Sequence, residues 1–284
     1  MAVAGSYERP ASLGAALALL AARRFRLLAG GTDLYPATGA RALSGDILDL
    51  TAIDDLRQIR SGREGVRFGA AATWSDIAEA PLPPVLAGLQ QAAREVGGRQ
   101  IQNAGTIGGN LCHASPAADG VPPLLAADAR VELASAAGLR VLPLADFITG
   151  PRQTALLPGE LLSAVLIPRQ ALIGRSVFRK LGARTYLVIS IASVALRLVV
   201  REGHIADAAV AVGACSAVAR RLPEVEAALA DAPLTDATRR ISDRMVADAL
   251  APLDDIRASA VYRGGAAAEL IRRAVADLCG VQHD

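Results

Sequence analysis

The stretch from residue 103 to 120, NAGTIGGNLCHASPAADG, is the part of this 284-residue chain that most restricts its fold. It is nearly uncharged, and residues 105–109 contain three glycines and a threonine. Because glycine weakens the interior of helices and strands, the stretch is unfavourable for either. An ordinary tight turn explains a single glycine pair, but a long loop with many hydrogen-bond donors is uncommon unless it binds a ligand. We therefore expect a binding loop here.

A second glycine loop, Gly30-Gly31-Thr32-Asp33, follows the apolar run RLLAG at 26–30, which predicts a buried strand. Asp33 is expected to open a short helix. Exposed peptide N–H groups in such a loop can point together at an anion, and glycine lets an oxygen-rich ligand come close. Two such loops in one domain suit a diphosphate held from both sides. Neither matches the spacing of a P-loop or a Rossmann fingerprint.

The polar side chains of the stretch 103–120 narrow the ligand further. Asp119, its one carboxylate, would repel a phosphate, so we expect it to face hydroxyls, such as those of a sugar-like chain. Cys112-His113 predicts a buried cysteine and a polar loop histidine, since no other Cys or His lies nearby. With Cys215 and Cys279 equally isolated, we expect no iron–sulfur cluster and no zinc in this chain.

Composition excludes several classes of function. A net charge of +2 and 3% aromatic residues give little support for nucleic-acid binding. No apolar run approaches the roughly 20 residues that cross a bilayer. Residues 12–22 predict an amphipathic helix capped by Ser12 and not a signal peptide, so we expect a cytoplasmic protein.

Lys180 is the one lysine among 30 basic residues. Either the base composition of the gene left a single lysine by chance, or this position needs a compact ammonium group.

The remaining patterns predict an α+β fold, since strands and helices are largely segregated towards the C-terminus. We expect a two-part domain with mixed sheets at 1–170, with subdomains at about 1–54 and 55–170. A C-terminal domain of antiparallel strands and a helical bundle is expected at 171–284. The predicted strands and hairpins lie at 46–50, 57–73, 130–144, 161–168 and 187–215, the loop at 151–160, and the helices at 84–96, 223–230, 235–250 and 258–278.

Four segments resemble the FAD-binding medium subunit of the molybdenum hydroxylases, the family of the carbon monoxide, nicotinate and xanthine dehydrogenases. LLAGGTDL (27–34) and NAGTIGGNLCHASPAADGVPPLLAADARVEL (103–133) are similar to its FAD-binding domain. FRKLGARTY (178–186) and YRGGAAAELIRRA (262–274) are similar to its C-terminal domain. The resemblance therefore covers the whole chain.

The resemblance implies that both glycine loops hold the diphosphate of FAD and that Asp119 binds the hydroxyls of the flavin's sugar-like chain. Leu162 would contact the isoalloxazine through its backbone, and Lys180 would lie at its pyrimidine edge, where a cation favours the anionic reduced ring. Tyr186 would be a lid over the ring. The implied FAD-binding residues are Leu27, Leu28, Ala29, Gly30, Gly31, Thr32, Asp33, Leu34, Thr106, Ile107, Gly108, Gly109, Asn110, Asp119, Leu162, Lys180 and Tyr186. No catalytic residue and no metal ligand are implied.

The function implied by the resemblance is electron transfer within a complex. A large molybdenum-cofactor subunit would oxidise the substrate, and a small subunit would pass the electrons through two iron–sulfur clusters to FAD in this chain, in a dimer of heterotrimers. A final acceptor would then take the electrons. Two alternatives stay open: a self-sufficient FAD-dependent reductase or oxidase of the same broad fold, and a non-redox module that binds a nucleotide diphosphate.

Overall fold

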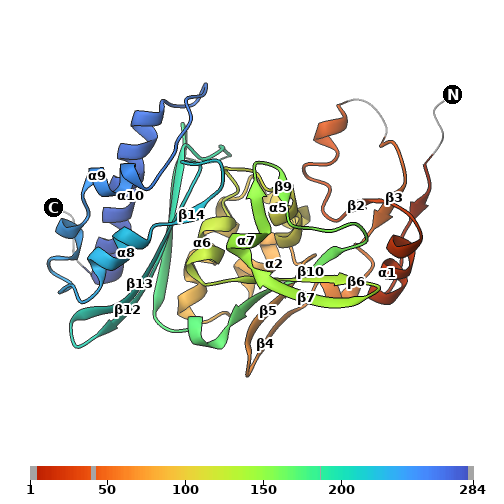
Figure 1. Cartoon of the computed structure of the whole chain (residues 1–284), viewed down its shortest axis with the longest axis horizontal. Coiled ribbons are helices and arrows are strands. Elements are labelled where there is room, and N and C mark those ends of the chain that lie inside the picture. Colours follow the sequence, from red (N-terminus) through yellow and green to blue (C-terminus); the bar gives the residue numbers. More distant parts are fainter. Residues whose placement is uncertain (1–4, 40–42, 186, 281–284) are drawn as a thin grey trace.

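The computed structural model describes residues 5–39, 43–185 and 187–280. An N-terminal lobe and a C-terminal domain lie at opposite ends of the molecule, with a five-stranded sheet and its helices between them (Figure 1). The predicted α+β class is confirmed. No helix among the described residues is long and apolar enough to span a membrane.

The N-terminal lobe is a three-stranded parallel sheet, of order β1-β3-β2, with one helix beside it. Ser12 caps this helix as predicted, since its hydroxyl accepts from the Ala15 N–H at 3.2 Å. The helix expected at Asp33 is wrong: the chain forms a turn there, and a short 3₁₀ helix starts only at Pro36, which favours the first helical position. The elements are β1 (Tyr7–Glu8), α1 (Leu13–Ala22), β2 (Arg26–Leu28), η1 (Pro36–Thr38), β3 (Ile47–Asp49) and η2 (Asp54–Leu56).

The central part is an antiparallel sheet of order β4-β5-β10-β6-β7, and its helices pack on it around a core that contains Phe68 of β5, Trp74 of α2 and Phe147 of α7. The predicted hairpins at 57–73 and 130–144 form. The loop expected at 151–160 contains one strand of a small two-stranded pair. The elements are β4 (Ile59–Gly62), β5 (Gly65–Gly69), α2 (Trp74–Glu79), η3 (Pro84–Leu86), α3 (Ala87–Glu95), α4 (Arg99–Ala104), α5 (Ile107–His113), α6 (Val121–Ala126), β6 (Arg130–Ser135), β7 (Gly138–Pro143), α7 (Leu144–Phe147), β8 (Ile148–Gly150), β9 (Gln153–Thr154) and β10 (Leu161–Pro168).

The expectation that 103–120 is a loop without helix is wrong. The stretch contributes to α4, α5 and α6, and the glycine-rich segment itself is the start of α5. The Thr106 hydroxyl caps this helix by accepting from the Gly109 N–H at 3.1 Å. A Cβ on Gly108 would lie 2.7 Å from the Ala70 carbonyl oxygen. Glycine here serves close packing of a helix on a strand, and that tertiary contact overrides its low helix propensity.

The C-terminal domain is a four-stranded antiparallel sheet, of order β11-β12-β13-β14, covered on both faces. Leu196 and Val210 face α8 and α10, whereas the smaller Ala195 and Ala209 face the central core, where α6 packs closely. The single helix expected at 235–250 is wrong, because Ser242 interrupts it and caps a second one. The elements are η4 (Arg169–Ala171), β11 (Arg175–Leu181), β12 (Ala192–Arg201), β13 (His204–Gly213), β14 (Arg220–Arg221), α8 (Pro223–Leu229), η5 (Ala237–Arg240), α9 (Asp243–Asp248) and α10 (Ala260–Cys279).

Candidate functional site

A cavity of about 940 Å³ lies where the three parts of the molecule meet, and its size is typical of a small-molecule or cofactor site. Of the implied residues, Ile107 does not line it, because its side chain is buried in the core. Tyr186 lies outside the described residues. The other implied residues all line the cavity: Leu27, Leu28, Ala29, Gly30, Gly31, Thr32, Asp33, Leu34, Thr106, Gly108, Gly109, Asn110, Asp119, Leu162 and Lys180.

The first glycine loop has an open backbone. The N–H groups of residues 30–34 donate no hydrogen bond to any residue that the structure describes. A Cβ on Gly30 would overlap the Ala104 carbonyl oxygen, and Gly31 has a φ of +68° with the Tyr35 ring 2.5 Å from where its Cβ would be. The loop therefore needs glycine for its shape, and a series of open amides beside a cavity is suited to anionic oxygens.

The second glycine segment differs from the expectation of bare amides. Its backbone N–H groups are already paired: Ile107 with the Ala72 carbonyl, Gly108 with the Ala70 carbonyl, and Gly109 and Asn110 with Thr106. A Cβ on Gly109 would meet only the Thr106 hydroxyl, at 2.9 Å, so the space beyond it is free. The Oδ1 atom of Asn110 is buried and has no hydrogen-bond partner among the described residues. A ligand that donates a hydrogen bond would satisfy it.

Lys180 and Asp119 form a buried ion pair at the cavity wall. The Lys180 Nζ lies 2.6 Å from Asp119 Oδ2, and the two side chains are only 6% and 8% exposed. The ammonium also donates to the Glu95 carbonyl at 3.3 Å, and the Ser190 hydroxyl donates to Asp119. Burial raises the pKa of Asp119, and Lys180 and Ser190 offset only part of that effect. The lone lysine therefore does not lie on a solvated surface.

Three charged or polar groups meet at another part of the cavity wall, and the sequence indicated only one of them as a site residue. His113 Nε2 lies 3.3 Å from Asp33 Oδ1 and 3.0 Å from Arg152 Nη1. His113 ends α5 and is not a loop residue as expected. No carboxylate of the described part of the chain lies within 4 Å of the Arg152 guanidinium, which leaves a cation beside the cavity for an anionic ligand.

The chemistry of the remaining groups is limited. Burial raises the pKa of the Cys112 thiol to about 12, so the thiol stays protonated at neutral pH and is a poor nucleophile or metal ligand. No group of three His, Cys, Asp or Glu side chains within the described ranges converges on a point where a metal could bind.

Sequence reasoning missed several apolar and glycine residues of the wall. Gly97 and Gly98 line the cavity, although their pattern predicted only the end of a helix. Trp74, the one tryptophan of the chain, and the segment 187–189 also line it. The paired glycines and the lone tryptophan were available signals. No sequence signal indicated the segment 187–189, because its position at the cavity follows only from how the C-terminal domain packs on the central part of the molecule.

Comparison with known proteins identifies two matching family models. The first, described as the FAD binding domain in molybdopterin dehydrogenase, matches residues 2–170. The second, described as the CO dehydrogenase flavoprotein C-terminal domain, matches residues 176–278.

Relatives and solved structures match over most of their length. The chain is 32% identical to the nicotine 6-hydroxylase medium subunit of Paenarthrobacter nicotinovorans, over 95% of this chain and 96% of the relative. It is 33% identical to the putative xanthine dehydrogenase FAD-binding subunit of Escherichia coli K12, over 91% and 90%. A structure of carbon monoxide dehydrogenase from Hydrogenophaga pseudoflava, which lacks the Mo-pyranopterin moiety, superposes with a TM-score of 0.90 at 27% identity, over the whole of both chains.

Proposed function

The chain belongs to the family of FAD-binding medium subunits of molybdenum hydroxylases, and on that premise we propose that it relays electrons through FAD held in the cavity. The open amides of residues 30–34 are the observation that carries this proposal. The oxygens of a diphosphate can accept hydrogen bonds from such amides. FAD contains a diphosphate, whereas FMN contains a single phosphate.

The other groups in the cavity fit the remaining parts of FAD. The buried Asn110 Oδ1 needs a donor, which a hydroxyl of the cofactor would provide. Arg152 would add positive charge for the diphosphate. Since Lys180 and Asp119 lie 2.6 Å apart, we propose that they contact adjoining parts of the cofactor: Asp119 the hydroxyls, and Lys180 the pyrimidine edge. Leu162 would contact the flavin through its backbone.

The flavin supplies the redox chemistry when bound, since it exchanges electrons both with one-electron and with two-electron partners. The residues of this chain bind and orient it and keep water away. We propose that residues 1–170 form the FAD-binding domain, with subdomains at about 1–54 and 55–170, and that residues 171–284 form the C-terminal domain. In support of this division, β10 ends at Pro168 and β11 begins at Arg175.

We further propose that a small subunit with iron–sulfur clusters delivers the electrons and that a large subunit with the molybdenum cofactor produces them, in a cytoplasmic dimer of heterotrimers. Relatives called medium or FAD subunits of hydroxylases and dehydrogenases support a multi-subunit complex. The self-sufficient flavoenzyme and the non-redox binding module remain as outcomes of the test.

The test is native purification of the chain with its partners, followed by an absorption spectrum and analysis of iron and molybdenum. We expect a yellow chain with one FAD, in a complex that contains both metals. A colourless chain that binds a nucleotide diphosphate would support the binding module. A yellow chain that oxidises a substrate without partners would support the self-sufficient flavoenzyme.

A further inference from the structure

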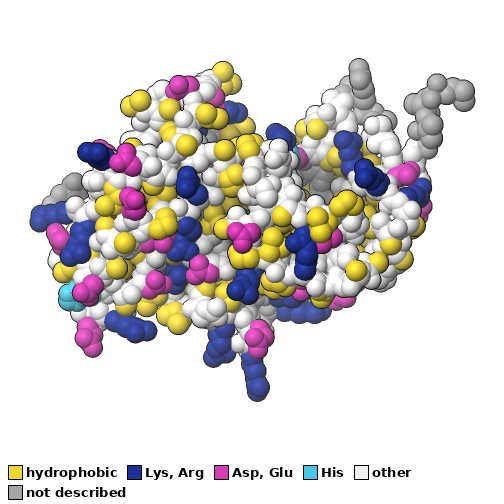
Figure 2. All heavy atoms as spheres, viewed as in Figure 1, with side chains coloured by type: hydrophobic (Ala, Val, Ile, Leu, Met, Phe, Trp, Pro, Cys, Tyr) yellow, Lys and Arg dark blue, Asp and Glu magenta, His cyan; other side chains and the backbone are white. Residues whose placement is uncertain are grey.

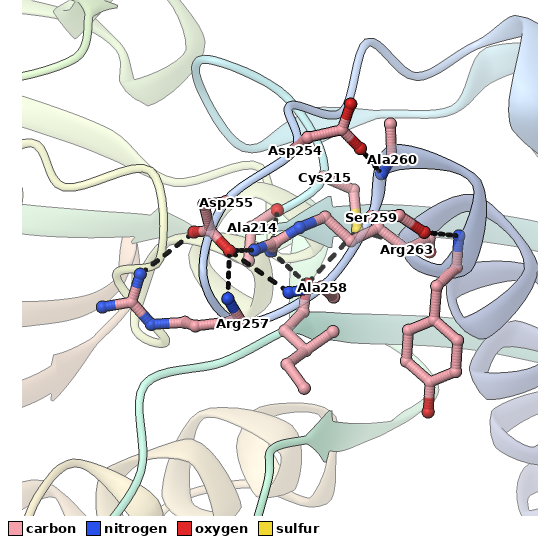
Figure 3. A network of polar contacts seen from close by, with 11 residues as sticks. Ala214, Cys215, Asp254, Asp255, Arg257, Ala258, Ser259, Ala260 and Arg263 are labelled. Atoms are coloured by element: carbon pink, nitrogen blue, oxygen red, sulfur yellow. Dashed lines mark hydrogen bonds and ion pairs between the residues drawn. The ribbon is translucent and has the colours of Figure 1, made fainter.

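Arg152 is the one arginine among the described residues that lines the cavity. Many other arginines of the chain lie beside a carboxylate, and basic and acidic side chains are interspersed over the face that Figure 2 shows. Arg263 is an example, since its Nη2 donates to Asp255 at 2.6 Å and its Nη1 to the Ala214 carbonyl at 3.0 Å (Figure 3). Arg152 has no such carboxylate among the described residues, and its guanidinium contacts His113 instead.

The end of α5 holds Arg152 at two points. The Arg152 backbone N–H donates to the Ala114 carbonyl at 2.8 Å, and Arg152 Nη1 lies 3.0 Å from His113 Nε2. Arg152 has a φ of +58° and Ala114 a φ of +49°, a left-handed backbone that is unfavourable for a residue with a Cβ. Such a conformation persists only where the surrounding structure maintains it. The turn between β8 and β9 is therefore fixed against the end of α5, with the Arg152 side chain beside His113.

The contact with Arg152 determines which nitrogen of His113 carries the proton. A guanidinium can only donate hydrogen bonds, so Nε2 accepts and the proton of the neutral ring is on Nδ1. Asp33 Oδ1 lies 3.3 Å from the same Nε2 and would need this nitrogen to donate. One nitrogen cannot serve both partners, and its shorter contact is the one with Arg152. The neutral ring therefore binds Arg152, whereas a protonated ring would bind Asp33 and repel Arg152.

We propose that neutral His113 is a positioning residue that keeps the Arg152 guanidinium at the cavity wall for the diphosphate of FAD. This inference rests on the proposed function. Asp33 belongs to the loop with the open amides, so its contact with His113 places the end of α5 beside that loop. The contact with His113 uses one N–H of the guanidinium, and the others remain for phosphate oxygens. Without His113, the long side chain of Arg152 would move among many rotamers, and its charge would act less on the ligand.

The first test is a double-mutant cycle on the affinity of the full chain for FAD, measured by equilibrium titration. Arg152→Met and His113→Leu are each expected to weaken binding a few-fold. The double variant should bind no more weakly than either single variant, because His113 acts through Arg152. His113→Gln should stay within about twofold of the wild type, since its carbonyl oxygen can accept from Arg152. The control is His204→Leu, which changes an exposed histidine on β13 and should leave the affinity unchanged.

The second test observes the His113 ring itself. Proton–nitrogen correlation NMR of the full chain at pH 8 distinguishes the two neutral forms of histidine, and the chain has only three histidines. The His113 signals, assigned with His113→Gln, should show the proton on Nδ1 in the wild type. In Arg152→Met the proton should shift towards Nε2, where it can be donated to Asp33. This test decides the inference even if His113→Leu does not fold.

The outcomes separate this inference from the function on which it rests. If FAD binds and the loss of affinity in the double variant equals the product of the two single losses, His113 and Arg152 act independently. The inference is then wrong and the proposed function stands. A wild-type His113 ring with its proton on Nε2 would overturn the inference in the same way. If the folded wild-type chain binds no FAD, the proposed function fails and this inference fails with it.

Discussion

At residues 30–34 the backbone N–H groups are open to a ligand, whereas at residues 107–110 the corresponding groups are paired within the protein. Both segments are rich in glycine and look alike in the sequence. In the first, Gly30 lets the loop lie against the Ala104 carbonyl. In the second, Gly108 lets α5 lie against Ala70. Glycine therefore marks where backbone comes close to backbone, and the hydrogen bonds decide which amides remain for a ligand.

Lys180 and Arg152, the two cationic side chains described at the cavity, also differ in whether they are paired within the protein. Lys180 is buried and paired with Asp119, whereas no carboxylate of the described chain pairs with Arg152. We expect changes at paired groups to lower the free energy of unfolding, and changes at open groups to weaken FAD binding.

Lys180→Met should have the largest effect. It leaves Asp119 buried without its counter-charge, and breaking a buried ion pair in this way costs about 3–5 kcal/mol. Burial raises the pKa of Asp119. The Asp119 carboxyl therefore binds its proton more tightly in the folded state than in the unfolded state, where the pKa of an aspartate is about 3.9. The loss of stability should therefore be small near pH 4 and grow as the pH rises. Urea unfolding at pH 5 and pH 8 measures it.

The double variant Lys180→Met, Asp119→Leu is the control for that experiment. It removes both charges, so it should recover most of the free energy of unfolding at pH 8 while FAD binding stays weak. A Lys180→Met variant as stable as the wild type at both pH values would show that the ion pair does not hold the cavity wall together.

Gly30→Ala should have the next largest effect, on FAD affinity. The new Cβ would overlap the Ala104 carbonyl oxygen and displace the loop with its open amides. We expect at least 100-fold weaker binding, about 2.7 kcal/mol, in an equilibrium titration followed by flavin fluorescence. Gly14→Ala is the matched control, because a Cβ there meets no other group within 4 Å. Unchanged affinity in folded Gly30→Ala would remove the loop from the site.

Gly109→Ala should have a smaller effect, because its amide is already paired with Thr106. The Cβ would meet the Thr106 hydroxyl at 2.9 Å and occupy some of the free space beside it. About 10-fold weaker FAD binding is expected, or about 1.4 kcal/mol, in the same titration. An effect larger than that of Gly30→Ala would reverse the roles of the two segments.

Arg152→Gln should have the smallest effect. The Arg152 side chain is exposed, and an exposed charge contributes about 0.2–1 kcal/mol. We therefore expect a few-fold loss of FAD affinity that disappears at high salt, because salt screens exposed charges. Titrations at low and high ionic strength measure it. A loss that is independent of salt would mean that Arg152 acts through packing and not through its charge.

Much of the fold could be predicted from the sequence, because strand alternation, caps and glycine loops are local patterns, whereas the positions of Leu162 and Lys180 at the cavity followed from the family resemblance. The helix at Ile107–His113 could not, since it depends on contacts with Ala70 and Ala72. The pairing of Lys180 with Asp119 joins residues 61 positions apart, and Arg152 reaches His113 over 39. Such contacts depend on how the domains pack, and no local pattern encodes them.

The central claim is that the open amides of residues 30–34 hold the diphosphate of FAD, while those of residues 107–110 belong to the fold. Amide hydrogen–deuterium exchange of the full chain, with and without FAD, tests it most directly, because exchange reports whether an N–H is hydrogen-bonded. The account predicts fast exchange at 30–34 that slows at least 10-fold with FAD, and slow exchange at 107–110 in both states. Exchange at 30–34 that stays fast with FAD fully bound, or protection that appears only at 107–110, would contradict it.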